Sequence, residues 1–221
     1  MKDRLDRQTI ALRVAKEFPD GAVVNLGAGI PVLAANFVPE GKTVIFHAEN
    51  GVLGFGGVPE NTEDEKPYYL GANGLPFSGL PGMCFFHHAD SFAMIRGGHI
   101  DVTVLGALQV SEKGDLANWT FPERGIGNIG GAMDLVSGCN RVIIAMEHLT
   151  PKGKMKILKT CSYPLTGLRC VNLIVTDIAV IEVTPKGLML KETAPGWTAD
   201  DVQALTEPKL ILSPDLREIE L

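Results

Sequence analysis

Glu49 is the carboxylate in this sequence whose surroundings best suit chemistry. It follows a strand-like run at 43–46 and stands directly before Asn50-Gly51, a pair typical of tight turns. Because apolar residues flank this turn at 44–46 and among 52–55, we expect it to pack against a core. A carboxylate that loses water there has a disfavoured charged form, which makes it a candidate for catalysis. On spacing alone, a solvated turn residue is the alternative.

His47 lies two residues before Glu49, so on a strand both side chains would point to the same face. His47 is therefore either a group that tunes Glu49 or a packing residue. The pair His87-His88 and His148 have no partner at a metal-ligand spacing. No GxSxG segment is present, so a Ser-His-Asp hydrolase is not supported.

Two glycine segments could place backbone N–H groups against a ligand. Gly27-Ala28-Gly29-Ile30-Pro31 follows an apolar run and could contact a phosphate or an acyl group, or could simply form a tight strand-to-helix turn. Gly125-Ile126-Gly127-Asn128-Ile129-Gly130 is a literal GxGxxG, and Glu147 follows at about the spacing of a dinucleotide fold. That fingerprint must directly follow a buried strand, whereas here Phe121-Pro122-Glu123-Arg124 intervenes. Nicotinamide or flavin binding is therefore the remote alternative.

The alternation of apolar runs with helix-like segments predicts an α/β fold, with a largely parallel sheet and flanking helices. Strands are expected at 22–26, 43–46, 102–108, 141–146, 171–176, 179–183 and 188–191, of which the last three could form a partly antiparallel edge. No linker or repeat divides the chain, so we expect a single domain over residues 1–221.

Capping residues and prolines place the expected helices. Helices are predicted at 4–18 with Asp3 as a cap, at 31–37 opened by Pro31, from Asp90 or Ser91 to Gly97-Gly98, and through Leu205 after a Thr198 cap. Prolines and acidic residues interrupt every period between 57 and 82, which predicts a long surface loop or flap.

Composition excludes several classes of protein. The 221 residues are 45% hydrophobic, and the formal net charge of -6 argues against a nucleic-acid binder. Four cysteines, at 84, 139, 161 and 170, form no CxxC pair, so we predict no metal site. No apolar run is long enough for a membrane span, and the charged start suits neither a signal nor a transit peptide, so we expect a cytoplasmic protein.

Several collinear stretches resemble the B (beta) subunit of the family I coenzyme A (CoA) transferases of the succinyl-CoA:3-oxoacid type. The turn Glu49-Asn50-Gly51-Val52-Leu53-Gly54 is similar to the catalytic segment of that family. The similarity continues to Asp200-Asp201-Val202-Gln203 and so covers effectively the whole chain. The other matching stretches are at 25–31, 91–98, 114–119, 130–136, 146–148 and 164–167.

This resemblance implies roles for particular residues. Glu49 would attack an acyl-CoA and, through a mixed anhydride, store CoA as a glutamyl-CoA thioester, giving ping-pong kinetics. Gly130 would supply the oxyanion-hole N–H group, with Gly131 as the fallback. The CoA-contacting residues would be Gly27, Ala28, Gly29, Ile30, Pro31, Asn50, Gly51 and Gly131. CoA would be a substrate and covalent intermediate, and neither a permanently bound cofactor nor a metal is implied.

The resemblance also implies a partner. The family is completed by an A (alpha) subunit, so we expect a paired A2B2 assembly in which this chain is inactive alone. The expected substrates are an acyl-CoA such as succinyl-CoA and an acid such as acetoacetate. The alternatives are an acetate/butyrate or 3-oxoadipate transferase, then an acyl-CoA hydrolase or a noncatalytic CoA-binding protein. Ala48 departs from the family, which often has Ser immediately before the glutamate.

Overall fold

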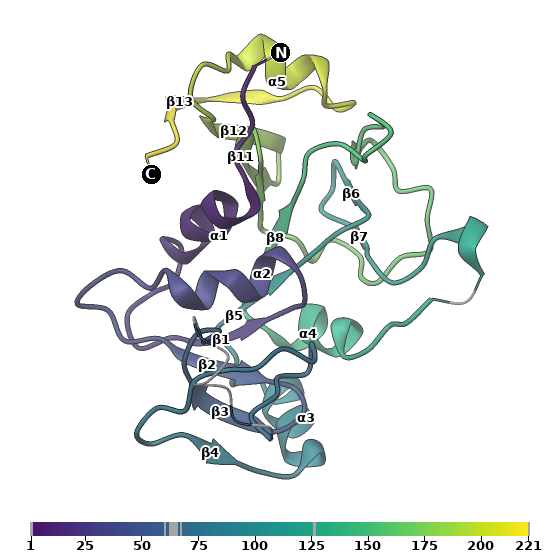
Figure 1. Cartoon of the computed structure of the whole chain (residues 1–221). Coiled ribbons are helices and arrows are strands. Elements are labelled where there is room, and N and C mark those ends of the chain that lie inside the picture. The colour runs from purple at the N-terminus through teal and green to yellow at the C-terminus, as the bar shows by residue number, and fades with distance from the viewer. Residues whose placement is uncertain (1, 60, 62–65, 67, 126, 221) are drawn as a thin grey trace.

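The computed structural model describes residues 2–59, 61, 66, 68–125 and 127–220. Its main element is a ten-stranded sheet with the strand order β13-β12-β11-β10-β8-β5-β1-β2-β3-β4 (Figure 1). The central strands are parallel, and their apolar residues suit burial on both faces. They are β10 (Leu173–Thr176), β8 (Arg141–Met146), β5 (Val102–Leu105), β1 (Val23–Leu26) and β2 (Ile45–Ala48). The predicted α/β fold with a largely parallel sheet is confirmed.

Antiparallel strands extend the sheet at both sides. Beyond β10, the strands β11 (Ala179–Thr184) and β12 (Gly187–Thr193) pair antiparallel, as predicted, and β13 (Ile211–Glu218) runs parallel to β12. Beyond β2 come β3 (Val52–Phe55) and β4 (Cys84–Phe85), both antiparallel. The pattern of apolar residues did not predict β3, β4 or β13. The strand expected at 102–108 ends at Leu105, and β6 (Gln109–Ser111) forms a separate small sheet with β7 (Leu116–Ala117) and β9 (Ile157–Leu158).

Helices cover both faces of the large sheet (Figure 1). On one face, α1 (Arg7–Ala15), α2 (Ile30–Leu33) and the 3-10 turn η1 (Ala34–Asn36) pack in a core that includes Ile10 and Val24. The core of the other face includes Ile95 of α3 (His88–Arg96), Leu135 of α4 (Ala132–Gly138) and Val202 of α5 (Ala199–Ala204). A further 3-10 turn, η3, spans Pro122–Arg124.

The predicted caps are right at one helix and wrong at two. Thr198 caps α5 through a capping box with Asp201, as expected. The cap of α1 is Asp6 and not Asp3, because Asp6 Oδ1 accepts the Thr9 N–H at 2.8 Å, and the helix ends at Ala15. The cap of α3 is His87, whose Nδ1 accepts the Ala89 N–H at 3.1 Å. Asp90 and Ser91, the predicted caps, lie inside that helix.

The loop predicted at 57–82 is partly described. Residues 60, 62–65 and 67 lie outside the described residues. In the described remainder, Leu70 and Pro76 form an isolated antiparallel bridge, and the backbone around them doubles back on itself. This segment therefore has local structure, which the prolines in its sequence did not predict.

Candidate active site

Glu49 lies where the parallel strands β1 and β2 both end. Because β1 and β2 run in the same direction, Gly27 after one strand and Glu49 after the other reach the same edge of the sheet. That edge is where open α/β sheets bind ligands. The chain then reverses into β3 through a tight turn, in which the Gly51 N–H donates to Ala48 O at 3.0 Å. Gly51 has φ 112°, and a Cβ there would overlap Phe86 O, so this turn requires glycine.

A pocket of about 240 Å³ opens at this edge and brings together half of the predicted site residues. Gly27, Ala28, Glu49, Gly130 and Gly131 all line it. The other five lie outside this lining. Gly29 caps α2 and is followed by buried Ile30 and Pro31, while Asn50 and Gly51 form the turn after Glu49.

The Glu49 carboxylate is half-buried, and several neighbouring groups affect its pKa. Burial raises the pKa of Glu49 above its ordinary value, and this is the dominant cause. A hydrogen bond from the Gly131 backbone N–H and the nearby His88 both act to lower the pKa, whereas Asp134 acts to raise it. Asp134 is itself paired with Arg96, with 2.6 Å between Oδ1 and Nε. The net result is a carboxylate that takes up a proton more readily than an exposed glutamate.

Gly130 and Gly131 approach this carboxylate with their backbones. The Gly131 N–H bonds Glu49, and a Cβ at residue 131 would overlap Glu49 Oε2. Only glycine permits that approach. The Gly130 N–H instead donates to Asn128 Oδ1 at 3.1 Å, and a Cβ there would lie 3.7 Å from Glu49 Oε1. Both glycines are therefore beside the carboxylate, and Gly131 makes the direct hydrogen bond.

His47 is part of a buried polar network with Asn25 and Ser91. The Asn25 Nδ2 lies 3.0 Å from His47 Nδ1, and the Ser91 Oγ lies 2.9 Å from His47 Nε2. Because an amide nitrogen can only donate, Nδ1 accepts, and the ring proton is on Nε2 and points to Ser91. Burial lowers the pKa of His47 to about 4, so the ring is neutral at neutral pH. Both ring nitrogens bond away from Glu49, which supports the packing interpretation and not the tuning one.

The GxGxxG segment does not directly follow a strand, which confirms the objection raised from the sequence. The turn η3 precedes it, and Ile126 lies outside the described residues. The Asn128 N–H donates to Trp119 O at 3.1 Å, and a Cβ at Gly127 would overlap that same carbonyl. Gly127 thus permits close packing on residues 119–120, three residues before Gly130.

Several residues that surround Glu49 were not predicted from the sequence. Asn25 lines the pocket, and its signal was a polar side chain within an otherwise apolar strand. Ala72 and Asn73 line it too, from the segment interpreted only as a loop. His88 and Asp134 act on the pKa of Glu49 from α3 and α4, and no spacing in the sequence linked them to it.

The residues that the structure describes contain no cluster of three or more His, Cys, Asp or Glu that could hold a metal ion. Across the same described ranges, no helix is both long and apolar enough to cross a membrane.

Residues 7–205 match the family described as Coenzyme A transferase, and the chain belongs to that family. It is 48% identical over 209 residues to the B subunit of 3-oxoadipate CoA-transferase from Pseudomonas putida, covering 94% of this chain and 97% of that protein. It is also 49% identical over 216 residues to the mitochondrial succinyl-CoA:3-ketoacid coenzyme A transferase 2B of Mus musculus. That match covers 97% of this chain but only 41% of the mouse protein, so the chain spans about two fifths of this relative.

The fold is also shared with a solved acyl-CoA transferase from Escherichia coli O157:H7, with a TM-score of 0.75. The two are 21% identical, and the likeness covers 98% of this chain and 44% of the other. At this identity the comparison concerns the fold alone.

The Ser91→Ala substitution tests the buried network. It removes the acceptor of the His47 Nε2 proton in a fully buried place, which leaves that donor unsatisfied. We expect a loss of about 1–3 kcal/mol in the free energy of unfolding, measured by urea denaturation. Ser137→Ala, at an exposed serine of α4, is the matched control and should change stability by less. Equal stability of the two variants would contradict the network.

The Gly131→Ala substitution tests the approach of the backbone to Glu49. Its Cβ would overlap Glu49 Oε2 and come within 3.0 Å of Phe92 Cζ, so the carboxylate must move. We expect the rate of a reaction at this carboxylate, measured as kcat with an acyl-CoA and an acceptor acid, to fall roughly 100-fold, because displacement of a reacting group by about 1 Å has effects of that size.

Gly106→Ala is the control for this variant, since a Cβ there meets nothing within 4 Å. Full activity of Gly131→Ala would show that the carboxylate position does not depend on Gly131.

Proposed function

We propose that this chain is the glutamate-bearing B half of a CoA-transferase that moves CoA between an acyl-CoA and a carboxylic acid. The observation that carries the proposal is Glu49 itself, a half-buried carboxylate that accepts the Gly131 N–H in an open pocket at the end of β2. Membership of the coenzyme A transferase family supports the same reaction. The names of its relatives suggest acids of the 3-oxo type, with succinyl-CoA as a donor.

In the proposed first half-reaction, a Glu49 carboxylate oxygen attacks the thioester carbonyl of the donor. The C–S bond breaks, CoA leaves as a thiolate, and Glu49 holds the acyl group as a mixed anhydride. The thiolate then attacks the glutamyl carbonyl, so that the donor acid leaves as a carboxylate and Glu49 carries CoA as a thioester. An acceptor carboxylate enters and the same steps run in reverse. No ATP is needed, because the enzyme carboxylate conserves the energy of the thioester bond.

The oxyanions of these steps need hydrogen-bond donors beside Glu49. We propose the N–H groups of Gly130 and Gly131 for this role. The Gly131 N–H already donates a hydrogen bond to the Glu49 carboxylate. The Gly130 N–H would become available once its hydrogen bond to Asn128 Oδ1 is broken. Gly27 and Ala28 line the same pocket and are proposed as CoA contacts. For Gly29, Ile30, Pro31, Asn50 and Gly51, a CoA-binding role remains a prediction based on the resemblance.

We also propose a partner. The P. putida relative is named as the B subunit of its enzyme, and the mouse relative is a longer polypeptide of which this chain matches 41%. An A-type half would complete the active site here, in an A2B2 assembly, and residues 1–221 would act in it as one domain.

Replacement of the nucleophile tests the proposed reaction. In the enzyme assembled with its A half, Glu49→Gln should lower the rate of CoA transfer roughly 1,000-fold or more, because no carboxylate remains to form the thioester. Glu40→Gln, at an exposed glutamate, should retain activity. Unchanged transfer in Glu49→Gln would contradict the mechanism. Release of free CoA without transfer to an added acid would identify a hydrolase instead.

The pH dependence of kcat/KM gives an independent test. Attack requires ionised Glu49, and burial raises its pKa, so activity should be present above the raised pKa and be lost as pH falls through it. The acid limb should therefore lie above the ordinary glutamate pKa of 4.5. An acid limb at or below that value would contradict the desolvation of Glu49.

A further inference from the structure

Arg96 forms an ion pair near Glu49 that the proposed steps of CoA transfer do not use. It is the last residue of α3, and its Nε lies 2.6 Å from Asp134 Oδ1 on α4. The side chain of Arg96 is 66% exposed and that of Asp134 is 28% exposed. Because an exposed ion pair contributes little to stability, the stability of the fold does not account for this one.

Asp134 lies on the side of α4 that faces Glu49. It follows Gly131, whose N–H donates to Glu49, by three residues. Residues three apart are neighbours on one side of a helix, so the Asp134 carboxylate is near that of Glu49. In agreement with this placement, Asp134 acts to raise the pKa of Glu49. A full negative charge at Asp134 would therefore oppose the ionisation of Glu49.

Phe92 links the position of Arg96 to that of Gly131. The Arg96 Cζ lies 5.5 Å from the centroid of the Phe92 ring, which is within the range of a cation–π contact. The same ring extends to Gly131, where a Cβ would come within 3.0 Å of Phe92 Cζ. Contacts with Asp134 and Phe92 therefore both hold the Arg96 guanidinium group on the Glu49 side of α3 and α4.

Two histidines complete the set of ionisable groups around Glu49. His88 on α3 acts to lower the pKa of Glu49, and its ring packs on that of Phe92 with 4.6 Å between centroids. His47 on β2 has a pKa of about 4 because of its burial, and both of its ring nitrogens are hydrogen-bonded elsewhere. His47 is therefore neutral at the pH at which the enzyme would act.

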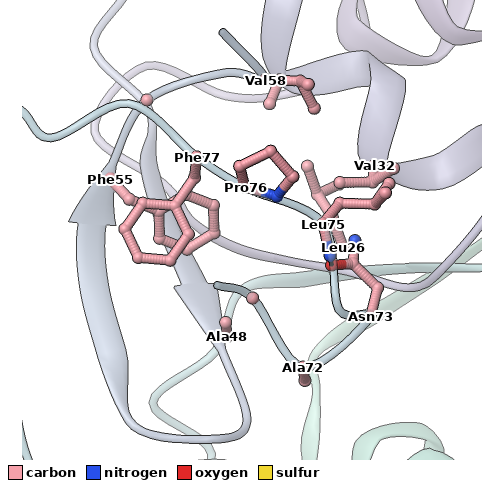
Figure 2. A pocket seen from close by; sticks show the side chains of 13 residues that line it. Leu26, Val32, Ala48, Phe55, Val58, Ala72, Asn73, Leu75, Pro76 and Phe77 are labelled. Carbon is pink, nitrogen blue, oxygen red and sulfur yellow. Dashed lines mark hydrogen bonds between the residues drawn. The ribbon is translucent and has the colours of Figure 1, made fainter. Parts of the chain in front are cut away.

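The pocket itself adds no further charge. Among the described residues that line the open pocket, Glu49 is the only one with an ionisable side chain. Ala72 and Asn73 belong to this lining, and Figure 2 shows them again with Ala48 around an adjoining apolar pocket. The described residues around that second pocket are uncharged as well. The charges that act on Glu49 therefore come from α3 and α4.

We propose that Arg96 is a positioning residue for the reaction at Glu49: by pairing with Asp134, it neutralises the negative charge that α4 places near the carboxylate and so keeps Glu49 ionised for attack. The inference rests on the proposed CoA transfer at Glu49. In this role Arg96 acts through Asp134 and touches neither Glu49 nor the substrate.

A double-mutant cycle of Arg96 and Asp134 tests the inference. In the enzyme assembled with its A half, kcat/KM for CoA transfer is measured against pH. Arg96→Gln leaves Asp134 unpaired and disfavours ionised Glu49, so the acid limb should move up by about 0.5–1 pH unit. Asp134→Asn removes the charge itself and should move the acid limb down. When Asp134→Asn is already present, Arg96→Gln should leave the acid limb in place.

Two further variants are controls. Arg96→Lys keeps a cation beside Asp134 and should restore the acid limb of the parent enzyme. Lys191→Gln breaks an exposed ion pair with Glu182 on β12 and β11, several strands away from β2, and should leave the acid limb unchanged. An Arg96→Gln effect of equal size with and without Asp134→Asn would overturn the inference. A loss of activity that is the same at every pH would overturn it too.

Infrared titration of the Glu49 carboxyl group separates this inference from the proposed function, because it needs no acyl-CoA. The signal is the difference between each enzyme and the same enzyme carrying Glu49→Gln. The midpoint should be lowest in Asp134→Asn, intermediate in the parent and highest in Arg96→Gln. If the midpoints keep this order but the parent does not transfer CoA, the proposed function fails and the control of the Glu49 charge by Arg96 stands. If parent and Arg96→Gln have equal midpoints while Glu49→Gln abolishes transfer, the inference is refuted and the proposed function stands.

Discussion

An ionised carboxylate that is taken partly out of water needs a hydrogen-bond donor close by, and Glu49 finds its donor in the backbone of Gly131. This places two requirements on the surrounding structure. The chain must deliver a carboxylate to the sheet edge, and a second segment must approach it without a side chain. A Cβ at residue 131 would overlap Glu49 Oε2, so the position of the carboxylate requires glycine at residue 131.

The elements around Glu49 satisfy this constraint from separate parts of the sequence. The parallel pairing of β1 with β2 sets the edge, and the turn into β3 exposes the carboxylate there. The buried network of Asn25, His47 and Ser91 connects β2 to β1 and α3. Residues 69–77 form a hairpin in which the Phe77 N–H donates to Tyr69 O, and the Asn50 side chain joins it to the same turn by donating to Leu70 O. The Glu49 carboxylate is therefore fixed by more than one segment, which suits the proposed reaction, in which positioning would supply much of the rate.

Local patterns predicted those features whose causes are local. The Asn-Gly pair identified the turn after Glu49, apolar runs identified the central strands, and Thr198 identified the cap of α5. Features that depend on distant contacts were missed. The two-residue strand β4 pairs with β3 across some thirty residues of chain, with the Phe86 N–H donating to Gly51 O at 2.9 Å, and no local pattern encodes this. Ser91 suggested a helix cap, but its hydroxyl is used by His47 inside the core. The glycines and prolines of 69–77 indicated a loop, although aromatic packing and backbone hydrogen bonds order this segment.

The central claim is that Glu49 becomes covalently bonded to CoA. The most direct measurement is peptide mass spectrometry of this chain, assembled with its A half and treated with an acyl-CoA in the absence of an acceptor acid. The account predicts a CoA adduct on the peptide that contains Glu49, which disappears when an acceptor acid is added and never forms in Glu49→Gln. Bound acyl-CoA without an adduct on any residue would contradict it.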